Sequence, residues 1–296
     1  MSLSEAIRPV VRPVRQQSAR IGRLRSTPWR RRRPIVVPAA LLLALIVAAL
    51  LAPVVSPYDP DTIDMSVALG NPGAEHLLGT DQLGRDQLSR LLYGGRATLL
   101  LTITATVGTI VIALVVGTIA GYAGGRLDLL LSTLLTVLLA LPSLLLTLAI
   151  LGILGPGTES LLIALIGAGW VGQARIFRAA ILGLREQLYV DAARSAGATP
   201  AWIVVRHLLP NLLPTVIVLA TLDLGGILLT VSSLSFLGMG VQPPTADWGV
   251  MLNDARPFFA ELPLLAIIPG LCITIVALAS NLLGDAIRDL VDVGRR

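Results

Sequence analysis

The sequence predicts an all-α membrane protein with six transmembrane helices and an ordered helical loop on the cytoplasmic side. Three observations lead to this prediction. The mean hydropathy is +0.80 and 54% of the residues are hydrophobic, which is outside the range of soluble domains. The apolar residues lie in runs near the roughly 20 residues with which a helix crosses a bilayer. A β-barrel would instead show short segments of alternating polarity.

The first apolar run covers residues 36–55 and follows a segment with ten arginines, four of them consecutive at 30–33. A secretory signal is the alternative, but the basic region is long and the apolar run is long enough to remain as a span. We therefore expect a basic cytoplasmic tail over 1–34. The first helix and an extracytoplasmic segment then occupy 35–96.

Five further apolar runs follow and form a predicted core domain over 97–284, with a cytoplasmic loop at 186–211 and a cytoplasmic tail at 285–296. With the N-terminus inside, 19 arginines lie on the cytoplasmic side and four lie outside, as the positive-inside rule requires. The basic tail is interpreted as a topology signal that contacts anionic lipid, and not as a nucleic-acid arm. The runs are 97–122, 127–154, 160–177, 212–237 and 264–283.

The composition excludes several kinds of chemistry. All 23 basic residues are arginine, so the chain lacks the lysine of a Walker A phosphate loop and of Schiff-base enzymes. Cys272 is the one cysteine, and His76 and His207 lie too far apart in sequence to suggest a metal site. Histidine, cysteine and serine show no catalytic spacing, so we expect no catalytic residues and no cofactor. If ATP drives this protein, another chain binds it.

The loop at 186–211 has the signals of two short helices. Residues 189–196 favour a helix that ends at Gly197, the residue type preferred at a left-handed C-terminal cap. Thr199 is placed to cap a second helix with Pro200 at its first position, and Pro210 is expected to end that helix. A DNA-binding helix-turn-helix is disfavoured because the second helix is apolar and leads into a span. A loop this long and ordered predicts a docking site, although a helix that packs only on its own bundle remains an alternative.

These residues resemble the EAA loop of the membrane subunits of ABC importers, which forms a coupling helix that docks on an ATPase subunit. The resemblance rests on Asp191-Ala192-Ala193, on Gly197 and on Leu209-Pro210. Asp191 stands where the family usually has glutamate, which keeps the charge and shortens the reach. The resemblance assigns docking to a set of residues in this loop: Asp191, Ala192, Ala193, Ser195, Gly197, Ala198 and Pro210.

Two further segments are similar to the C-type permeases of the oligopeptide, dipeptide and nickel branch. One covers 79–94, and the other begins with Leu234-Ser235-Phe236-Leu237-Gly238 and continues to Trp248-Gly249. Val231 departs from the pattern, because relatives commonly carry an acidic residue just before this second run. If that residue helps to line the path in relatives, the handling of substrate differs here.

The resemblance implies a type I importer permease in a bacterial plasma membrane. It implies four kinds of partner: a second homologous permease subunit, two ATP-binding subunits that hold ATP and magnesium, an extracytoplasmic binding protein, and a peptide cargo. A nickel chelate or glutathione is the alternative cargo. The chain is then the non-catalytic subunit of an ATP-hydrolysing complex.

Asp223 lies near the middle of the fifth predicted span, where an ionisable side chain is costly unless it faces water or the interior of the bundle. We expect it to line a translocation path together with Thr230, Ser232 and Ser235. Two alternatives remain: a structural carboxylate at 223, and small residues that serve close helix packing. In a competing class, a self-sufficient secondary transporter, Asp223 would couple transport to protons or ions. No internal repeat supports that class.

Overall fold

The computed structural model describes the backbone of residues 28–293 and the side chains of residues 35–291. The predicted tail over 1–34 lies outside these residues, apart from the first turns of α1. The chain divides into a unit of residues 1–33 and a unit of residues 34–296. The helices are α1 (Pro28–Leu50), α2 (Ala52–Val55), α3 (Gln87–Ala123), α4 (Gly125–Leu139), α5 (Ser143–Leu154), α6 (Thr158–Arg185), α7 (Leu188–Ser195), α8 (Pro200–Ile203), α9 (Leu209–Phe236), α10 (Trp248–Ala255) and α11 (Leu264–Val293).

The described residues contain no β-strand, which confirms the predicted all-α class. Short 3-10 turns lie at η1 (Met65–Val67) and η3 (Arg256–Phe258), and a π-turn, η2 (Val204–Leu208), joins α8 to α9. Within the described residues, four helices are long and apolar enough to cross a membrane: α3, α6, α11 and the continuous stretch Pro200–Phe236. The pair α4 and α5 makes a fifth if its two helices are counted together. The first of the six predicted runs forms α1, whose apolar part, Ile35–Leu50, is shorter than these.

The third predicted run, 127–154, is not one straight helix. It breaks between Leu139 and Ser143, and the axes of α4 and α5 differ by 86°. Pro142 explains the break, because a proline lacks the N–H that a helix interior needs and disfavours helical backbone at the residue before it. Pro142 itself has a non-helical backbone, with φ −56° and ψ 128°. The sequence signal for this bend was present at Pro142.

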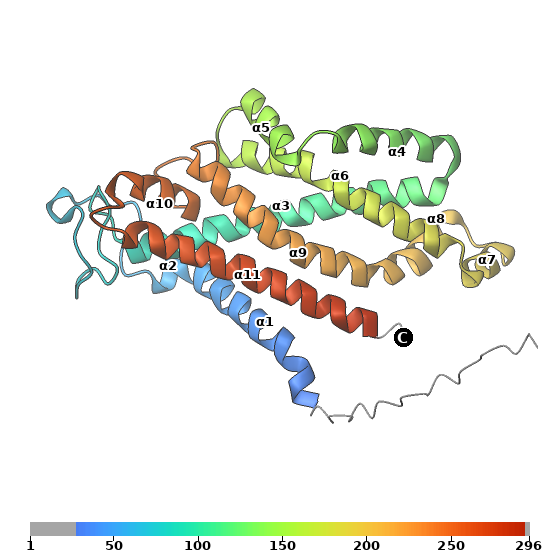
Figure 1. Ribbon diagram of the computed structural model, residues 1–296, viewed down its shortest axis with the longest axis horizontal. Helices are drawn as coiled ribbons and strands as arrows, with labels where there is room; N and C mark the ends of the chain where they lie inside the picture. Colours follow the sequence, from blue (N-terminus) through green and yellow to red (C-terminus); the bar gives the residue numbers. More distant parts are fainter. Residues whose placement is uncertain (1–27, 294–296) are drawn as a thin grey trace, which may run out of the picture. The chain divides into compact units, whose positions relative to one another are not determined.

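Helices α3, α6, α9 and α11 form the body of the second unit (Figure 1). These four helices and the shorter helices beside them contribute buried side chains to three apolar clusters of the described residues. Cluster A includes Phe177, Val190 and Leu208, cluster B includes Leu101, Leu161 and Val231, and cluster C includes Leu228, Trp248 and Val276. Clusters A and B follow each other along α3, α6 and α9, so these three helices share one long contact.

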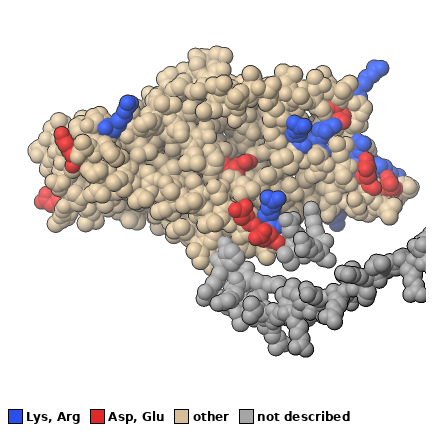
Figure 2. All heavy atoms as spheres, viewed as in Figure 1, with Lys and Arg blue, Asp and Glu red and all other residues tan. Residues whose placement is uncertain are grey.

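The two ends of this helical body carry different structures. Helices α7 and α8 lie at one end, and α10 lies at the other end beside the irregular segment of residues 56–86 (Figure 1). The face in Figure 2 shows few charged side chains between these ends. This arrangement is that of a protein whose middle contacts lipid and whose ends contact water.

Candidate functional site

The segment of α7 and α8 has the two-helix form that the sequence predicts. Gly197 follows α7 with a φ of +83°, a backbone conformation that favours glycine. Its N–H donates to Arg194 O at 3.0 Å, and the N–H of Ala198 donates to Ala193 O at 3.0 Å. These two bonds are the Schellman arrangement, which satisfies carbonyls at a helix C-terminus. The predicted cap at Gly197 is confirmed.

The second helix begins as predicted but does not end before Pro210. The Thr199 side chain accepts from the N–H of Trp202 at 3.4 Å, and Pro200 is the first helical residue. Beyond α8 the chain widens into η2, in which the N–H of Leu209 bonds to Val204 O, and it continues through Pro210 into α9. The prediction that Pro210 ends the helix is therefore wrong. The wide turn leaves room for the proline ring, which in a regular α-helix collides with the carbonyl four residues earlier.

The α7 and α8 segment has a buried side and an exposed side. Val190, Ile203 and Leu208 are at most 1% exposed and belong to cluster A, so they hold the segment against α6 and α9. Among the predicted docking residues, Ala193 and Ala198 pack against the same cluster. The others lie on the exposed side: Asp191, Ala192, Ser195, Gly197 and Pro210. Leu188, 86% exposed, adds an apolar side chain to that side. This surface offers a partner both apolar contacts and a carboxylate.

His207 contributes to this segment in a way that the sequence did not reveal. Its ring lies 5.7 Å from the ring of Tyr189 on α7 and 5.0 Å from the ring of Trp202 on α8, measured between centroids. Aromatic pairs in this range attract each other through tilted or edge-to-face contacts. Tyr189 and His207 are 18 positions apart across a turn, so no sequence spacing could have paired them.

Asp223 lies between two apolar clusters. One turn before it, Leu219 and Ala220 pack against cluster A, and one turn after it Ile227 packs against cluster B. Its side chain is half-buried, and its buried Oδ2 has no hydrogen-bond partner among the described residues. Thr230 lies seven residues later, on the same face of α9. Its hydroxyl donates to Gly226 O at 2.9 Å.

The part of α3 that lies between clusters A and B is also polar. Thr106 and Thr109 lie between Ala105 of cluster B and Ile110 of cluster A, and both are buried. Each hydroxyl donates to a carbonyl of its own helix, so the hydroxyl oxygens keep acceptor capacity. Between clusters A and B, the helical body therefore carries the carboxylate of Asp223 on α9 and the hydroxyls of Thr106 and Thr109 on α3.

Ser232, Ser235 and Val231 lie in other surroundings. Ser232 and Ser235 are buried against α10, where a side chain at Gly249 would collide with the backbone carbonyl of Ser232. The Ser235 hydroxyl accepts from the N–H of Val241 at 3.4 Å. Val231 is fully buried in cluster B. Of the four predicted path residues, α9 thus brings Asp223 and Thr230 onto one face and places the two serines in the contact with α10.

Asp247 joins α10 to α3. Its Oδ1 accepts from the N–H groups of Gly249 and Val250 at 2.9 and 3.2 Å, which caps α10. Its Oδ2 accepts from the hydroxyl of Thr98 on α3 at 2.6 Å. The carboxylate is fully buried, and this burial raises its pKa above the ordinary value, although the hydrogen bonds act in the opposite direction.

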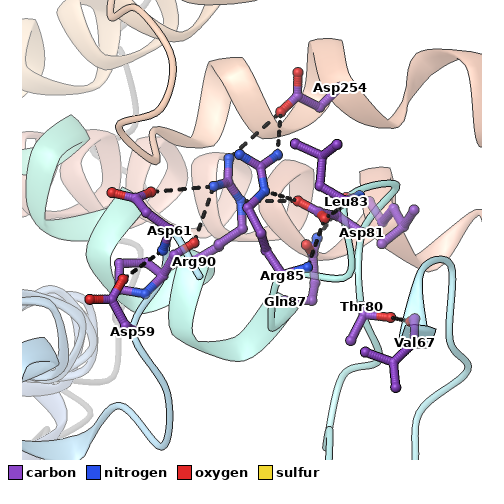
Figure 3. A network of polar contacts seen from close by, with 12 residues as sticks. Asp59, Asp61, Val67, Thr80, Asp81, Leu83, Arg85, Gln87, Arg90 and Asp254 are labelled. Carbon is purple, nitrogen blue, oxygen red and sulfur yellow. Dashed lines mark hydrogen bonds and ion pairs between the residues drawn. The ribbon is translucent and has the colours of Figure 1, made fainter. Parts of the chain in front are cut away.

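A buried charge network completes the same end of the molecule (Figure 3). Arg85 Nε lies 2.7 Å from Asp81 Oδ2, and Arg85 Nη2 lies 3.3 Å from Asp254 Oδ2 of α10. Arg90, only 1% exposed, lies 3.4 Å from Asp81 and 3.7 Å from the more exposed Asp61. Paired guanidiniums and carboxylates compensate one another's charge in a site that water hardly reaches. The spacing of Asp81 and Arg85 hinted at their pair, but nothing in the sequence pointed to Asp254.

A family model described as "Binding-protein-dependent transport system inner membrane component" matches residues 113–296. The chain is 41% identical over 256 residues to the nickel transport system permease protein of Escherichia coli (strain K12). This match covers 84% of this chain and 92% of that protein. It is 36% identical over 273 residues to the dipeptide transport system permease protein of Alkalihalophilus pseudofirmus, with 90% of each covered. It is 38% identical over 274 residues to the glutathione transport system permease protein of Escherichia coli O6:K15:H31, also with 90% of each covered.

Among solved structures, the fold is similar to a chain of the MetNI methionine ABC transporter in inward-facing conformations. The TM-score is 0.55 at 21% sequence identity, and the match covers 68% of this chain and 96% of that chain. At this identity the likeness concerns the fold. The expectation of a type I importer permease fold is confirmed.

Proposed function

Because the chain belongs to the family of binding-protein-dependent transport system inner membrane components, we propose that it forms part of the membrane path of a peptide importer driven by partner ATPases. It is a multi-pass permease subunit of an ABC importer, as the family and the curated relatives show. We propose that a second homologous permease, two ATP-binding subunits and an extracytoplasmic binding protein complete the complex.

The observation that carries this proposal is the geometry of the α7 and α8 segment. Its inner side is fixed to cluster A by residues that are at most 1% exposed, and its outer side presents Leu188, Asp191 and Ser195. A short helix with a rigid base and an exposed, mixed surface can pass the movement of a docked subunit to the helices beneath it. We therefore assign it as the coupling helix.

This assignment also orients the chain. ATP is available in the cytoplasm, so α7 lies on the cytoplasmic side, and α10 with residues 56–86 lies on the opposite side. The distribution of arginines supports the same orientation, with both termini inside. A delivered cargo would then enter at the α10 end and leave at the α7 end.

We further propose that the cargo passes Asp223 and Thr230. These residues share a face of α9 in the polar interval between clusters A and B, and the carboxylate has no partner among the described residues. A carboxylate there can attract the amine of a peptide during its passage. The relatives named for dipeptide and glutathione support a peptide cargo, and the relative named for nickel supports the alternative of a metal chelate.

Reconstitution tests this function. The chain, its partner permease, both ATPases and the binding protein are placed in liposomes, and the uptake of alanyl-alanine, glutathione and a nickel–histidine chelate is measured in parallel. We expect uptake of one of these compounds only with ATP and with all subunits present. Uptake that persists without the ATPases would contradict the proposal and would favour a secondary transporter. If only the nickel chelate is taken up, the cargo is a metal chelate and not a peptide.

A further inference from the structure

Helices α9 and α11 lie side by side and run in opposite directions (Figure 1). Two glycines permit their close contact. A Cβ at Gly225 would lie 3.2 Å from Ala277 O, and a Cβ at Gly284 would lie 2.6 Å from Leu222 Cδ2. These contacts place residue 277 beside residue 225 and residue 284 beside residue 222. The turns of α11 that follow Gly284 therefore face the turns of α9 that precede Leu222.

A groove of about 280 Å³ lies between these turns, at the end of the molecule that carries α7 and α8. Its polar lining consists of Thr215 on α9 and Arg288 on α11. The other lining residues are apolar: Pro214, Val218, Leu219, Leu222 and Val291. Walls of this composition favour contact with a hydrocarbon chain over contact with water.

The depth of Arg288 matches that of the lipid headgroups. Leu264 begins α11 at the other end of the molecule, and Arg288 follows about 36 Å further along the helix, at a rise of 1.5 Å per residue. The hydrocarbon layer of a bilayer is about 30 Å thick, and a typical helix tilt of about 20° shortens the span of α11 only slightly. Arg288 therefore lies at the level of the phosphates. Gly284, beside Leu222, is about 6 Å deeper, where the acyl chains begin.

A carboxylate accompanies Arg288 at this depth. Arg288 and Asp289 are both exposed, and none of the ion pairs of the described side chains includes either of them. With 100° between successive residues of a helix, Asp289 lies on the side of α11 that faces away from α9, and about 1.5 Å nearer to the water. Asp285, one turn earlier, lies about 4.5 Å deeper than Arg288. The groove thus ends at a cation, and an anion lies beside that cation at nearly the same depth.

We propose that this groove binds a phospholipid whose headgroup carries a primary amine, namely phosphatidylethanolamine. The guanidinium of Arg288 donates to two phosphate oxygens, the geometry in which arginine binds phosphate most strongly. The carboxylate of Asp289 accepts from the ammonium group, and the start of one acyl chain lies against Val218 and Leu219. An anionic lipid without an amine fits less well, because it brings a further negative charge close to Asp289.

A segment of another protein is the alternative occupant, since exposed apolar surfaces also bind proteins. The order of the charges favours the lipid. A bilayer holds phosphate and ammonium groups at the depth of Arg288 and Asp289, and acyl chains directly below them, which is the order of the lining in this groove. A protein segment would have to reproduce that order of groups. The lipid site goes beyond the proposed transport function, because lipid binding requires neither ATP nor cargo.

Photoreactive lipids test the site. The full chain, with its co-purifying subunits, is placed in phosphatidylcholine nanodiscs that contain a small fraction of phosphatidylethanolamine with a diazirine near the glycerol end of one acyl chain. After illumination, mass spectrometry measures the label on residues 214–222. We expect about fivefold more label than from the diazirine analogues of phosphatidylcholine, which lacks an N–H donor, and of phosphatidylglycerol, which lacks an amine. Equal labelling by the three lipids would overturn the proposal.

Variants separate the two parts of the headgroup. Arg288→Gln should lower the label from all three lipids about tenfold, because each carries a phosphate. Asp289→Asn should lower only the label from phosphatidylethanolamine, to the level of phosphatidylcholine. Asp285→Asn, an exposed acidic neighbour outside the site, is the matched control and should be labelled like the wild type.

The same experiment also addresses the alternative occupant. Full labelling in Arg288→Gln would overturn the site. A photo-crosslinker at Leu222 reports what fills the groove: capture of a protein chain, without lipid label on residues 214–222, would overturn the lipid in favour of a protein. A failed uptake measurement would leave these results unchanged, so the proposed function and the lipid site fail separately.

Discussion

The buried side chain of Asp247 joins α10 to α3 at one end of the molecule. We expect Asp247→Ala to lower the free energy of unfolding by about 2 kcal/mol, because it removes a helix cap and leaves the Thr98 hydroxyl without its acceptor. Asp247→Asn should cost about 1 kcal/mol or less, since its carbonyl still caps α10. Thermal unfolding of the purified chain in detergent measures both changes. Equal losses in the two variants would contradict the role of the cap.

The same carboxylate gives stability a pH dependence. Burial raises the pKa of Asp247, so the folded state holds this proton more tightly than the unfolded chain, in which the pKa is near the ordinary value of 3.8. The resulting stabilisation is full below that value and is lost as the pH rises through the raised pKa. Asp247→Asn has no such titration. The wild type should therefore lose stability relative to Asp247→Asn as the pH rises above the ordinary pKa of 3.8.

Asp223 allows a test of the proposed path. We expect Asp223→Asn to lower the rate of peptide uptake roughly tenfold, as the loss of about 1.4 kcal/mol of favourable interaction with a cationic group would do. Assembly with the partner subunits should not change. The buried Oδ2 of Asp223 has no hydrogen-bond partner among the described residues, so the substitution breaks no hydrogen bond there. Asp285→Asn, an exposed site on α11, is the control. Wild-type uptake in Asp223→Asn would remove this residue from the path.

At the scale of elements, the cap of α7 can be strained without touching the core. A Cβ at Gly197 would meet nothing within 4 Å, so only the backbone conformation opposes a side chain there. We expect Gly197→Val to cost roughly 1–2 kcal/mol locally, to displace α7, and to raise the ATP hydrolysed per peptide transported. Membrane insertion should be unchanged. Gly172→Val, on α6 with the same open space and ordinary backbone, should transport normally; uncoupling in that variant would contradict the argument.

Some features of the helices were predictable from the local sequence, and others were not. The caps at Gly197 and Thr199 were predictable because each depends on residue types a few positions apart. The continuation of the helix through Pro210 was not predictable. A π-turn can accommodate a proline, and no local residue pattern indicates a π-turn. The bend at Pro142 lies between these cases: the proline was visible, but its angle depends on the packing of α4 and α5 against α3 and α6. Contacts such as that between His207 and Tyr189 depend on the fold alone.

At the scale of the whole molecule, apolar runs and the arginine asymmetry sufficed to predict a polytopic helical protein. They did not reveal which polar residues meet in three dimensions. Asp223 and Thr230 share a face by helix periodicity, whereas Ser232 and Ser235 turn toward α10, whose position no sequence pattern indicated. The shared face of Asp223 and Thr230 was therefore predictable from the periodicity of α9, and the contact of the two serines with α10 was not.

The buried charges of Arg85 and Arg90 also set an order for biosynthesis. Arg85 and Asp254 are separated by 169 positions, so the ribosome has synthesised α9 and most of α10 before this carboxylate exists. Until then, Arg85 and Arg90 share Asp81, and Arg90 alone also lies near the more exposed Asp61. The segment of residues 56–86 is synthesised early but is thus among the last parts to gain its final contacts. A nascent chain arrested before α10 would lack Asp254, which contacts both guanidiniums, and their charges would be incompletely neutralised.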